Sequence, residues 1–164
     1  MADLRLTKRD RFLAAVDAAP VPMGILNITP DSFSDGGHYS STEAAIQQAL
    51  RMQTEGASIV DIGAESTRPD ATPVPQKEEL CRLEPILGAV CKALEIAVSI
   101  DTYKAVVARR AAELGVAVIN DIWGLQGDPD MAAVTAETDC ALIAMHNRAS
   151  VDPDADIIED MLCF

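Results

Sequence analysis

The stretch GILNITPDSFSDGG, residues 24–37, decides the fold of this chain. An apolar run over residues 23–28 stops at a Thr-Pro pair, and a polar segment that ends in two glycines follows. The run is typical of a buried strand, and the polar segment is typical of a loop that carries functional groups. The stretch therefore predicts a strand that leads into a functional loop. The side chains that they would deliver to a site are Asn27, Asp31, Phe33 and Asp35.

The same unit of strand, loop and helix recurs along the rest of the chain. Further apolar strands are predicted at residues 58–63, 97–100, 116–119 and 141–145. Helical spacing of apolar residues predicts helices between the strands, at residues 41–56, 76–94, 104–114 and 130–137. Strands that are apolar on both faces are typical of a parallel sheet covered by helices. The pattern therefore predicts the α/β class.

Polar residues recur where the predicted strands end: Asn27, Asp61 with Glu65, Asp101, Asn120 with Asp121, and His146. The carboxyl ends of parallel strands form the ligand-binding face of a (β/α)-barrel, or the crevice of an open doubly wound sheet. No glycine-rich nucleotide motif follows the first strand, so the barrel is favoured. A full barrel of eight units takes about 250 residues. We therefore expect a lead-in segment at residues 1–22 and a partial barrel at residues 23–164, truncated on its C-terminal side.

These strand-end side chains supply carboxylates and carboxamides, which suit a planar, amide-rich heterocycle. Each of them taken alone is more often a turn former or a helix cap. Arg68, next to Thr67, is suited to pair with a phosphate group, which would add an anionic part to the ligand. The alternative for Arg68 is an ion pair with Glu65 or Asp70.

A cation site is one interpretation of the first loop. Asn27, Asp31 and Asp35 offer the oxygen ligands that Mg²⁺ prefers. The alternative is that the two aspartates only solvate an exposed loop. His38 and His146 show neither HxH nor HExxH spacing, and we interpret both as structural or loop residues.

Composition and charge narrow the class of protein. The 164 residues are 49% hydrophobic, which is enough for a sizeable core, and the net charge is −13. A strongly acidic surface repels nucleic acid and acidic membranes, so neither is expected as a partner. The four cysteines form no CxxC pair and are expected to be reduced, which predicts a cytoplasmic protein. The sequence shows neither a signal-peptide pattern nor an apolar run of the ~18 residues that a membrane span needs.

Four motifs together resemble one known family. GILNITPDSFSDGG, IVDIGAESTRP, SIDTYK and VINDI follow one another in the order and spacing found in dihydropteroate synthase, the sulfonamide target of folate biosynthesis. The resemblance covers residues 21–146 and implies a (β/α)₈ TIM barrel, of which this chain has about the first five units. It implies a transferase that condenses 6-hydroxymethyl-7,8-dihydropterin diphosphate with para-aminobenzoate. The products would be 7,8-dihydropteroate and pyrophosphate.

The resemblance also implies roles for the residues at matching motif positions. Asp101 and Asn120 would bind the pterin ring. Asn27 and Thr67 would contact the diphosphate and its Mg²⁺, with Asn27 as the metal ligand. Loop residues would close over the site and build the aminobenzoate pocket, namely Asp31, Phe33 and Asp35 in the first loop and Arg68 and Pro69 in the second.

The implied reaction begins with loss of pyrophosphate, which leaves a pterin methyl cation. Mg²⁺ and Arg68 would offset the charge of the leaving group, and Asp101 would stabilise the developing positive charge. The aniline nitrogen then attacks, so no covalent nucleophile is required. The catalytic residues implied in this way are Asp101, Arg68 and Asp35.

Two features depart from the family's pattern. Asp70 stands where the family has a glycine after ESTRP, and its charge would compete for Arg68, so we expect weaker anion binding. The family's later motifs, from strands six to eight, are not in this chain, and two sheet edges would be unpaired. We therefore expect this polypeptide alone not to be a competent synthase. The full-length protein is expected to be a homodimer, as is general in the family.

Two other interpretations stay open. A pterin-binding methyltransferase domain shares the barrel and several strand-end Asp and Asn residues, but it lacks the TPDSFSDGG and ESTRP loops. A non-catalytic truncated paralogue or fragment would act through binding, for example by completing a barrel with a second chain.

Overall fold

The computed structural model of this chain describes residues 6–28, 41–65, 72–148 and 152–164. Six helices and five strands lie within these ranges. The helices are α1 (Lys8–Ala18), α2 (Ser41–Thr54), α3 (Gln76–Ala93), α4 (Ala105–Glu113), α5 (Met131–Glu137) and α6 (Ile157–Cys163). The strands are β1 (Met23–Asn27), β2 (Ile59–Gly63), β3 (Ala97–Asp101), β4 (Val118–Asp121) and β5 (Ala141–Ala144).

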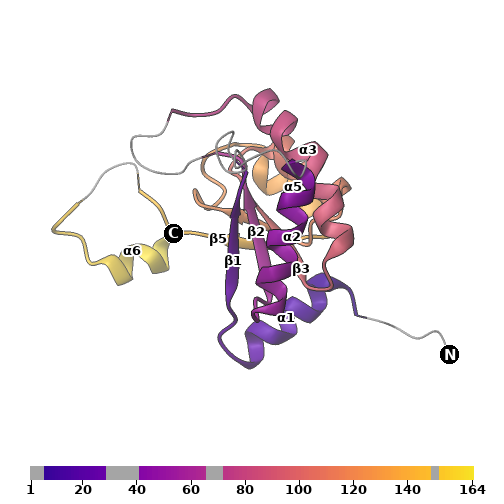
Figure 1. Cartoon of the computed structure of the whole chain (residues 1–164). Helices are drawn as coiled ribbons and strands as arrows, with labels where there is room; N and C mark the ends of the chain where they lie inside the picture. The colour runs from indigo at the N-terminus through magenta and orange to yellow at the C-terminus, as the bar shows by residue number, and fades with distance from the viewer. Residues whose placement is uncertain (1–5, 29–40, 66–71, 149–151) are drawn as a thin grey trace.

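The five strands form one parallel sheet in the order β1-β2-β3-β4-β5, which confirms the predicted α/β class. Each strand is therefore the neighbour of the next one along the chain. Helices α2, α3 and α5 lie together on one side of the strands, and α1 lies at the end where β1 begins (Figure 1). Consecutive helices from α2 to α5 pack against one another. This is the arrangement of successive β/α units in a barrel wall.

Alternate strand residues face opposite sides of the sheet, because the side-chain period of a strand is two. The helix-covered side carries the larger apolar cluster, which includes the strand residues Val60, Ile62, Val98, Ile100 and Ile119. We call the other side the inner face. Near the start of the strands the inner face carries a smaller apolar cluster, made of Ile59, Ala97, Ala117 and Val118 with Phe12 of α1. Polar residues continue this face toward the carboxyl ends, namely Asp61, Ser99, Asp101 and Asn120.

The two edge strands are less buried than their apolar sequences predict. All five positions of β2 are buried, whereas β1 is exposed at three of its five positions and β5 is partly buried or exposed throughout. Ile25, which is on the inner face of β1, is 63% exposed. Each edge strand has one neighbouring strand within the described residues, so less of its surface is covered.

The predicted element boundaries agree with the structure to within about two residues, with one consequence for the site. The fourth strand was expected at residues 116–119, but β4 begins at Val118 and includes Asn120 and Asp121. Gly115, with φ of 102°, turns the chain after α4, and two residues lead into the strand. Asp101 likewise belongs to β3, where it pairs in register with Asn120. The placement of Asp61 at a strand end is wrong, because it is the central residue of β2.

Two further expectations concern cysteines and membrane insertion. All four cysteines are free; Cys91 is buried, whereas Cys81 and Cys163 are exposed. In the described part of the chain no helix combines the length and the apolar composition that crossing a membrane requires.

Candidate functional site

Three of the predicted ligand-binding residues lie in one row across the carboxyl ends of the strands. Asn27 is in register with Gly63, Gly63 with Asp101, and Asp101 with Asn120. Residues in register on parallel strands share a face of the sheet, so this row belongs to the inner face. Asn27 is exposed, and Asp101 and Asn120 are partly buried. The fold thus brings together the three predicted site residues that the structure describes.

The glycine in this row makes room for the carboxylate of Asp101. A Cβ atom on Gly63 would lie 3.4 Å from Oδ2 of Asp101. The Asp101 side chain therefore lies over Gly63, in the space between β1 and β3. A larger residue at position 63 would crowd the carboxylate and narrow the space between Asp101 and Asn27.

Asp61 forms a buried hydrogen-bonded centre beneath this row. Its side chain is two residues before Gly63 on the same face, and the residue is 5% exposed. The Ser99 hydroxyl donates to Oδ1 at 2.5 Å, and the Asn120 amide nitrogen donates to Oδ2 at 3.0 Å. Burial raises the pKa of Asp61, while the two donors act in the opposite direction. Asp61 thus links β2, β3 and β4 through side chains as well as through the ladder.

Asp101 carries the one carboxyl group of the row, and the pKa of this group is strongly raised. Burial is the largest cause, followed by the negative charges of Asp61, Glu79, Glu65 and Asp121, and together they raise its pKa from 3.8 to about 7. A carboxyl group with this pKa changes charge near neutral pH, which favours a functional role over a turn-forming one. The turn former at this edge is Asp121, which accepts from the backbone amides of Trp123 and Leu125, each at 2.8 Å.

A second buried network surrounds Lys104, just after β3. Its ammonium group bonds Glu65 and also Oε2 of Glu79, at 2.5 Å for the latter. Glu65 in addition accepts from the Tyr103 hydroxyl at 3.1 Å and from the amide of Val74 at 3.2 Å. Burial acts to lower the pKa of Lys104, but the hydrogen bonds that it donates to Glu65 and Glu79 outweigh burial and raise the pKa, so Lys104 is a cation. Glu65 therefore has a cationic partner, Lys104, among the described residues, whereas Arg68 lies outside them.

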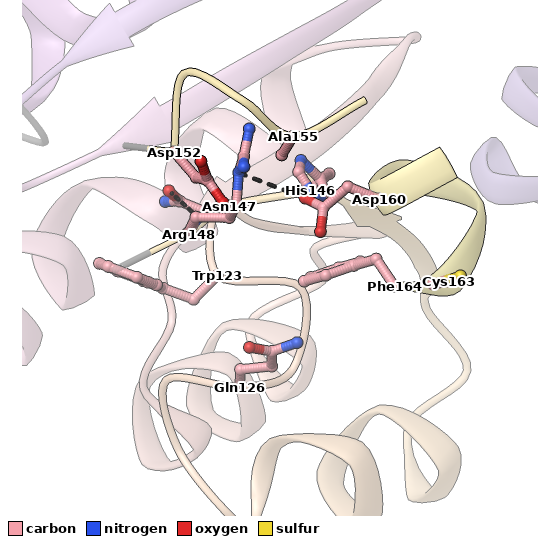
Figure 2. A pocket seen from close by; sticks show the side chains of 10 residues that line it. All are labelled: Trp123, Gln126, His146, Asn147, Arg148, Asp152, Ala155, Asp160, Cys163 and Phe164. Carbon is pink, nitrogen blue, oxygen red and sulfur yellow. Dashed lines mark hydrogen bonds and ion pairs between the residues drawn. The ribbon is translucent and has the colours of Figure 1, made fainter. Parts of the chain in front are cut away.

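A cavity of about 730 Å³ lies between the segments after β4 and β5 and helix α6 (Figure 2). Trp123 and Gln126 line one part of it, and His146 and Arg148 line another. Three polar groups of this cavity contact each other: Asp160 of α6 accepts from His146 Nε2 at 2.6 Å and lies 3.2 Å from Arg148 Nε. The partner of His146 in the structure is thus Asp160.

The other predicted site residues lie outside the described residues. They are Asp31, Phe33, Asp35, Thr67, Arg68 and Pro69. The Mg²⁺ prediction rests partly on them. His38, interpreted as a structural or loop residue, and Asp70 also lie outside the described residues. Among the residues that the structure describes, no group of three or more His, Cys, Asp or Glu side chains forms a metal site. Asn27 is the one predicted metal ligand in the described ranges, and its exposed carboxamide oxygen is of the type that Mg²⁺ accepts.

Comparison with known proteins identifies the family. A sequence profile described as "Pterin binding enzyme" matches residues 23–162, which is most of the chain. The chain belongs to the pterin-binding enzyme family. The row of Asn27, Asp101 and Asn120 lies inside the matched segment, and so does the Asp61 centre.

Relatives within the pterin-binding enzymes are similar to this chain at the level of sequence. The dihydropteroate synthase of Bacillus subtilis is 49% identical over 140 residues, which are 85% of this chain and 49% of that protein. The chain spans about half the length of the curated relatives that it matches. The relatives' names agree with the resemblance that the four motifs show.

Solved structures of dihydropteroate synthases share this fold. The enzyme from Clostridium difficile, in the presence of pteroic acid, superposes with a TM-score of 0.81 at 47% identity, over 87% of this chain and 54% of that one. The enzyme from Xanthomonas albilineans, with 4-aminobenzoic acid, superposes with a TM-score of 0.78 at 40% identity, over 88% of this chain and 53% of that one. The enzyme from Yersinia pestis, in a sulfonamide complex, superposes with a TM-score of 0.76 at 39% identity, over 89% of this chain and 55% of that one. The predicted partial barrel is therefore confirmed as the fold of this chain.

Sequence reasoning missed the side chains that support the row. Asp61 was noted but given no role, and neither Ser99 nor the pairing of Lys104 was predicted. One signal was available, because Ser99 and Asp101 are two apart in an apolar strand, as are Asp61 and Gly63. Polar or small residues at a spacing of two mark one face of a strand. Their partners, in contrast, come from strands distant in sequence.

Proposed function

We propose that this chain supplies the pterin-binding part of a dihydropteroate synthase. The reaction condenses 6-hydroxymethyl-7,8-dihydropterin diphosphate with para-aminobenzoate and yields 7,8-dihydropteroate and pyrophosphate. The observation that carries the proposal is the row of Asn27, Asp101 and Asn120, with Asp101 tuned to change charge near neutral pH. The similar enzymes bound to pteroic acid and 4-aminobenzoic acid support both substrates, and the sulfonamide complex supports sulfonamides as inhibitors.

The chemistry proceeds by loss of the diphosphate before attack by the amine. The bond between the pterin methylene carbon and the diphosphate oxygen breaks, and its electron pair leaves with pyrophosphate. Asp101 and Asn120 hold the ring, and the Asp101 carboxylate stabilises positive charge that spreads into the ring nitrogens. The aniline nitrogen then bonds to the methylene carbon and loses a proton. Within this scheme Arg68 and Thr67 bind the anionic groups. Asp35 closes over the site from the first loop, and Phe33 and Pro69 line the aminobenzoate pocket.

Magnesium is the proposed cofactor, and Asn27 is its proposed protein ligand. Mg²⁺ usually keeps several waters and takes one or two protein oxygens together with substrate phosphates, which fits a single exposed carboxamide at a strand end. When bound, the ion would offset the negative charge of the departing diphosphate. The role of Asn27 without the metal is to hold the diphosphate end of the substrate over β1.

The remaining parts of the proposal concern the whole protein. We infer a lead-in segment at residues 1–22 and a barrel domain from residue 23 onward. Four free cysteines support a reducing compartment, the cytoplasm. A homodimer is proposed for the full-length protein on the strength of the family resemblance alone. A methyltransferase domain is less well supported, because the similar proteins named above are synthases.

Titration of the chain with 6-hydroxymethylpterin tests the proposed binding role. We expect the parent to bind, and Asp101→Asn and Asn120→Ala to weaken binding by about tenfold or more, which corresponds to one lost charged hydrogen bond. Parent binding should strengthen as the pH rises through about 7, because ionised Asp101 accepts through both oxygens and carries a charge that strengthens hydrogen bonds from ligand N–H groups. Burial is the largest cause of this pKa, and the charged groups that add to it are Asp61, Glu79, Glu65 and Asp121. Equal affinity in all three chains would contradict the proposed binding role.

A further inference from the structure

We propose that Asp61 is a positioning residue that fixes the orientation of the Asn120 carboxamide, and so sets the hydrogen-bonding edge that the inner face offers to a ligand. The inference rests on the proposed function for the identity of the ligand, a pterin. It concerns a residue that does not belong to the row itself. Asp61 is two residues before Gly63 of the row on β2, and it acts through Asn120.

The geometry of Asp61 leaves little freedom. Asp61 is 5% exposed and Ser99 is fully buried, so neither side chain can exchange these hydrogen bonds for water. The Ser99 hydroxyl holds Oδ1 at 2.5 Å, which is a normal distance for a hydroxyl on a carboxylate. The other oxygen, Oδ2, is the one that faces Asn120. The carboxylate is thus oriented by β3 before it contacts β4.

A carboxylate only accepts hydrogen bonds, whereas a carboxamide has a donor end and an acceptor end of nearly the same shape. The 3.0 Å contact with Asp61 therefore requires the Asn120 nitrogen on that side. The carbonyl oxygen and the second N–H are then left for a ligand. Without Asp61, two orientations of the carboxamide related by a half-turn would compete, and each would present a different edge.

Asn120 in this orientation works together with its neighbour in the row. Asp101 is in register with Asn120 and is an acceptor when ionised. The two side chains then present two acceptors, with one donor from the remaining Asn120 N–H. This edge fits a heterocycle that carries adjacent ring and exocyclic N–H groups beside a ring nitrogen that accepts. A pterin has this alternation of donors and acceptors. A heterocycle without N–H donors would leave the acceptors of Asp101 and Asn120 unpaired, and unpaired buried acceptors carry a desolvation penalty.

The first test reads the carboxamide directly, without any ligand. The exchange rate of the Asn120 side-chain amide protons is measured by NMR, with the exposed Asn27 amide as internal reference. In the parent we expect Asn120 to exchange at least about tenfold more slowly than Asn27, as a hydrogen bond to a buried charge implies. Asp61→Ala should bring the rate to within about twofold of Asn27. Asp61→Asn should fall between, because its amide oxygen still accepts.

Ser99→Ala provides a second route if Asp61→Ala does not fold. It keeps the carboxylate and removes the hydroxyl that orients it, so protection of Asn120 should fall by about threefold. The matched control is Asp128→Asn. Asp128 caps the start of α4 by accepting from the backbone amide of Ala105 at 2.9 Å. This variant therefore also loses a carboxylate, but one whose hydrogen bond in the cap is to the backbone and not to a side chain. Its Asn120 protection should equal that of the parent.

The second test measures the affinity for 6-hydroxymethylpterin in the same chains. Asp61→Ala should weaken binding by about tenfold, Asp61→Asn should restore part of it, and Asp128→Asn should bind as the parent does. The proposal is overturned if folded Asp61→Ala keeps the parent's Asn120 protection, or if it loses that protection and still binds the pterin with the parent's affinity. If the parent itself does not bind the pterin, the binding role proposed for the row fails, and the exchange measurement alone decides whether Asp61 orients Asn120.

Discussion

Asp101 is the residue at which ligand binding and stability oppose each other. Burial of its carboxyl group, together with the negative charges of four other carboxylates, raises its pKa to about 7. A structural aspartate would be paired with a cation or a backbone amide, as Asp121 is. Asp101 is instead kept close to charges of its own sign. Such an arrangement is typical of a group that waits for a ligand.

Replacing Asp101 by Asn should therefore stabilise the chain at high pH. The unfolded carboxyl titrates near 3.8 and the folded one near 7, so the folded state binds more protons in that window and parent stability falls as the pH rises through it. Solvent screening reduces the effect because the group is partly exposed. We expect Asp101→Asn to raise the free energy of unfolding by about 1 to 2 kcal/mol at about pH 8, and to leave it unchanged at about pH 4. Urea unfolding across this range measures the difference. Parallel pH profiles of the two chains would refute the assignment.

Asp70 allows a prediction from sequence alone. It follows ESTRP at a position where the family has glycine, and we propose that its charge competes with a phosphate for Arg68. Asp70→Gly should therefore bind pyrophosphate more tightly, by about threefold to tenfold, with a weaker dependence on salt. Calorimetric titration measures both quantities. Equal pyrophosphate affinity in the two chains would exclude this competition.

At the scale of elements, the Lys104 network ties three segments together. Lys104 follows β3, Glu65 follows β2, and Glu79 is in the first turn of α3. The side chains of Lys104, Glu65 and Glu79 are 14%, 9% and 1% exposed. Glu65 also accepts from the amide of Val74, so the network joins both sides of the segment between β2 and α3. Thr67 and Arg68 belong to that segment in the sequence.

Lys104→Met should be strongly destabilising, because it leaves Glu65 and Glu79 buried without their cation. Breaking a buried ion pair in this way costs about 3 to 5 kcal/mol. The matched control is Arg51→Met in α2, which breaks the exposed pair with Glu55 and should cost less than about 0.5 kcal/mol. Denaturant unfolding of the parent and both variants measures the two losses in free energy of unfolding. Similar losses in the two would show that the network contributes no more than a surface pair.

The elements could be predicted because their signal is local. Apolar spacing gave the positions of α2, α3 and β2 to within about two residues, and the four motifs gave the family. The networks could not be predicted in the same way. Lys104 is 39 residues from Glu65 and 25 from Glu79, and Asp61 is 59 residues from Asn120. The tertiary packing of the strands and of α3 brings these partners together, and no local pattern encodes it.

At the scale of the whole molecule, the described sheet has two edges. β1 and β5 each pair with one strand, and Ile25 on the inner face of β1 is 63% exposed. The similar solved structures are about twice as long as the part that this chain covers. In a closed barrel every strand has two neighbours and the inner face is filled by side chains. We therefore expect the inner face of this sheet to be completed by further β/α units.

The most direct test of the account is reconstitution of dihydropteroate synthesis. This chain is mixed with the C-terminal half of the Bacillus subtilis relative, beginning after the segment that matches, and turnover of pterin diphosphate and para-aminobenzoate is measured with Mg²⁺. We predict no turnover from either piece alone, turnover from the mixture, and a loss of at least about a hundredfold when this chain carries Asp101→Asn. Folded Asp101→Asn mixtures that turn over as fast as the parent mixture would contradict the claim that this chain supplies the pterin-binding residues.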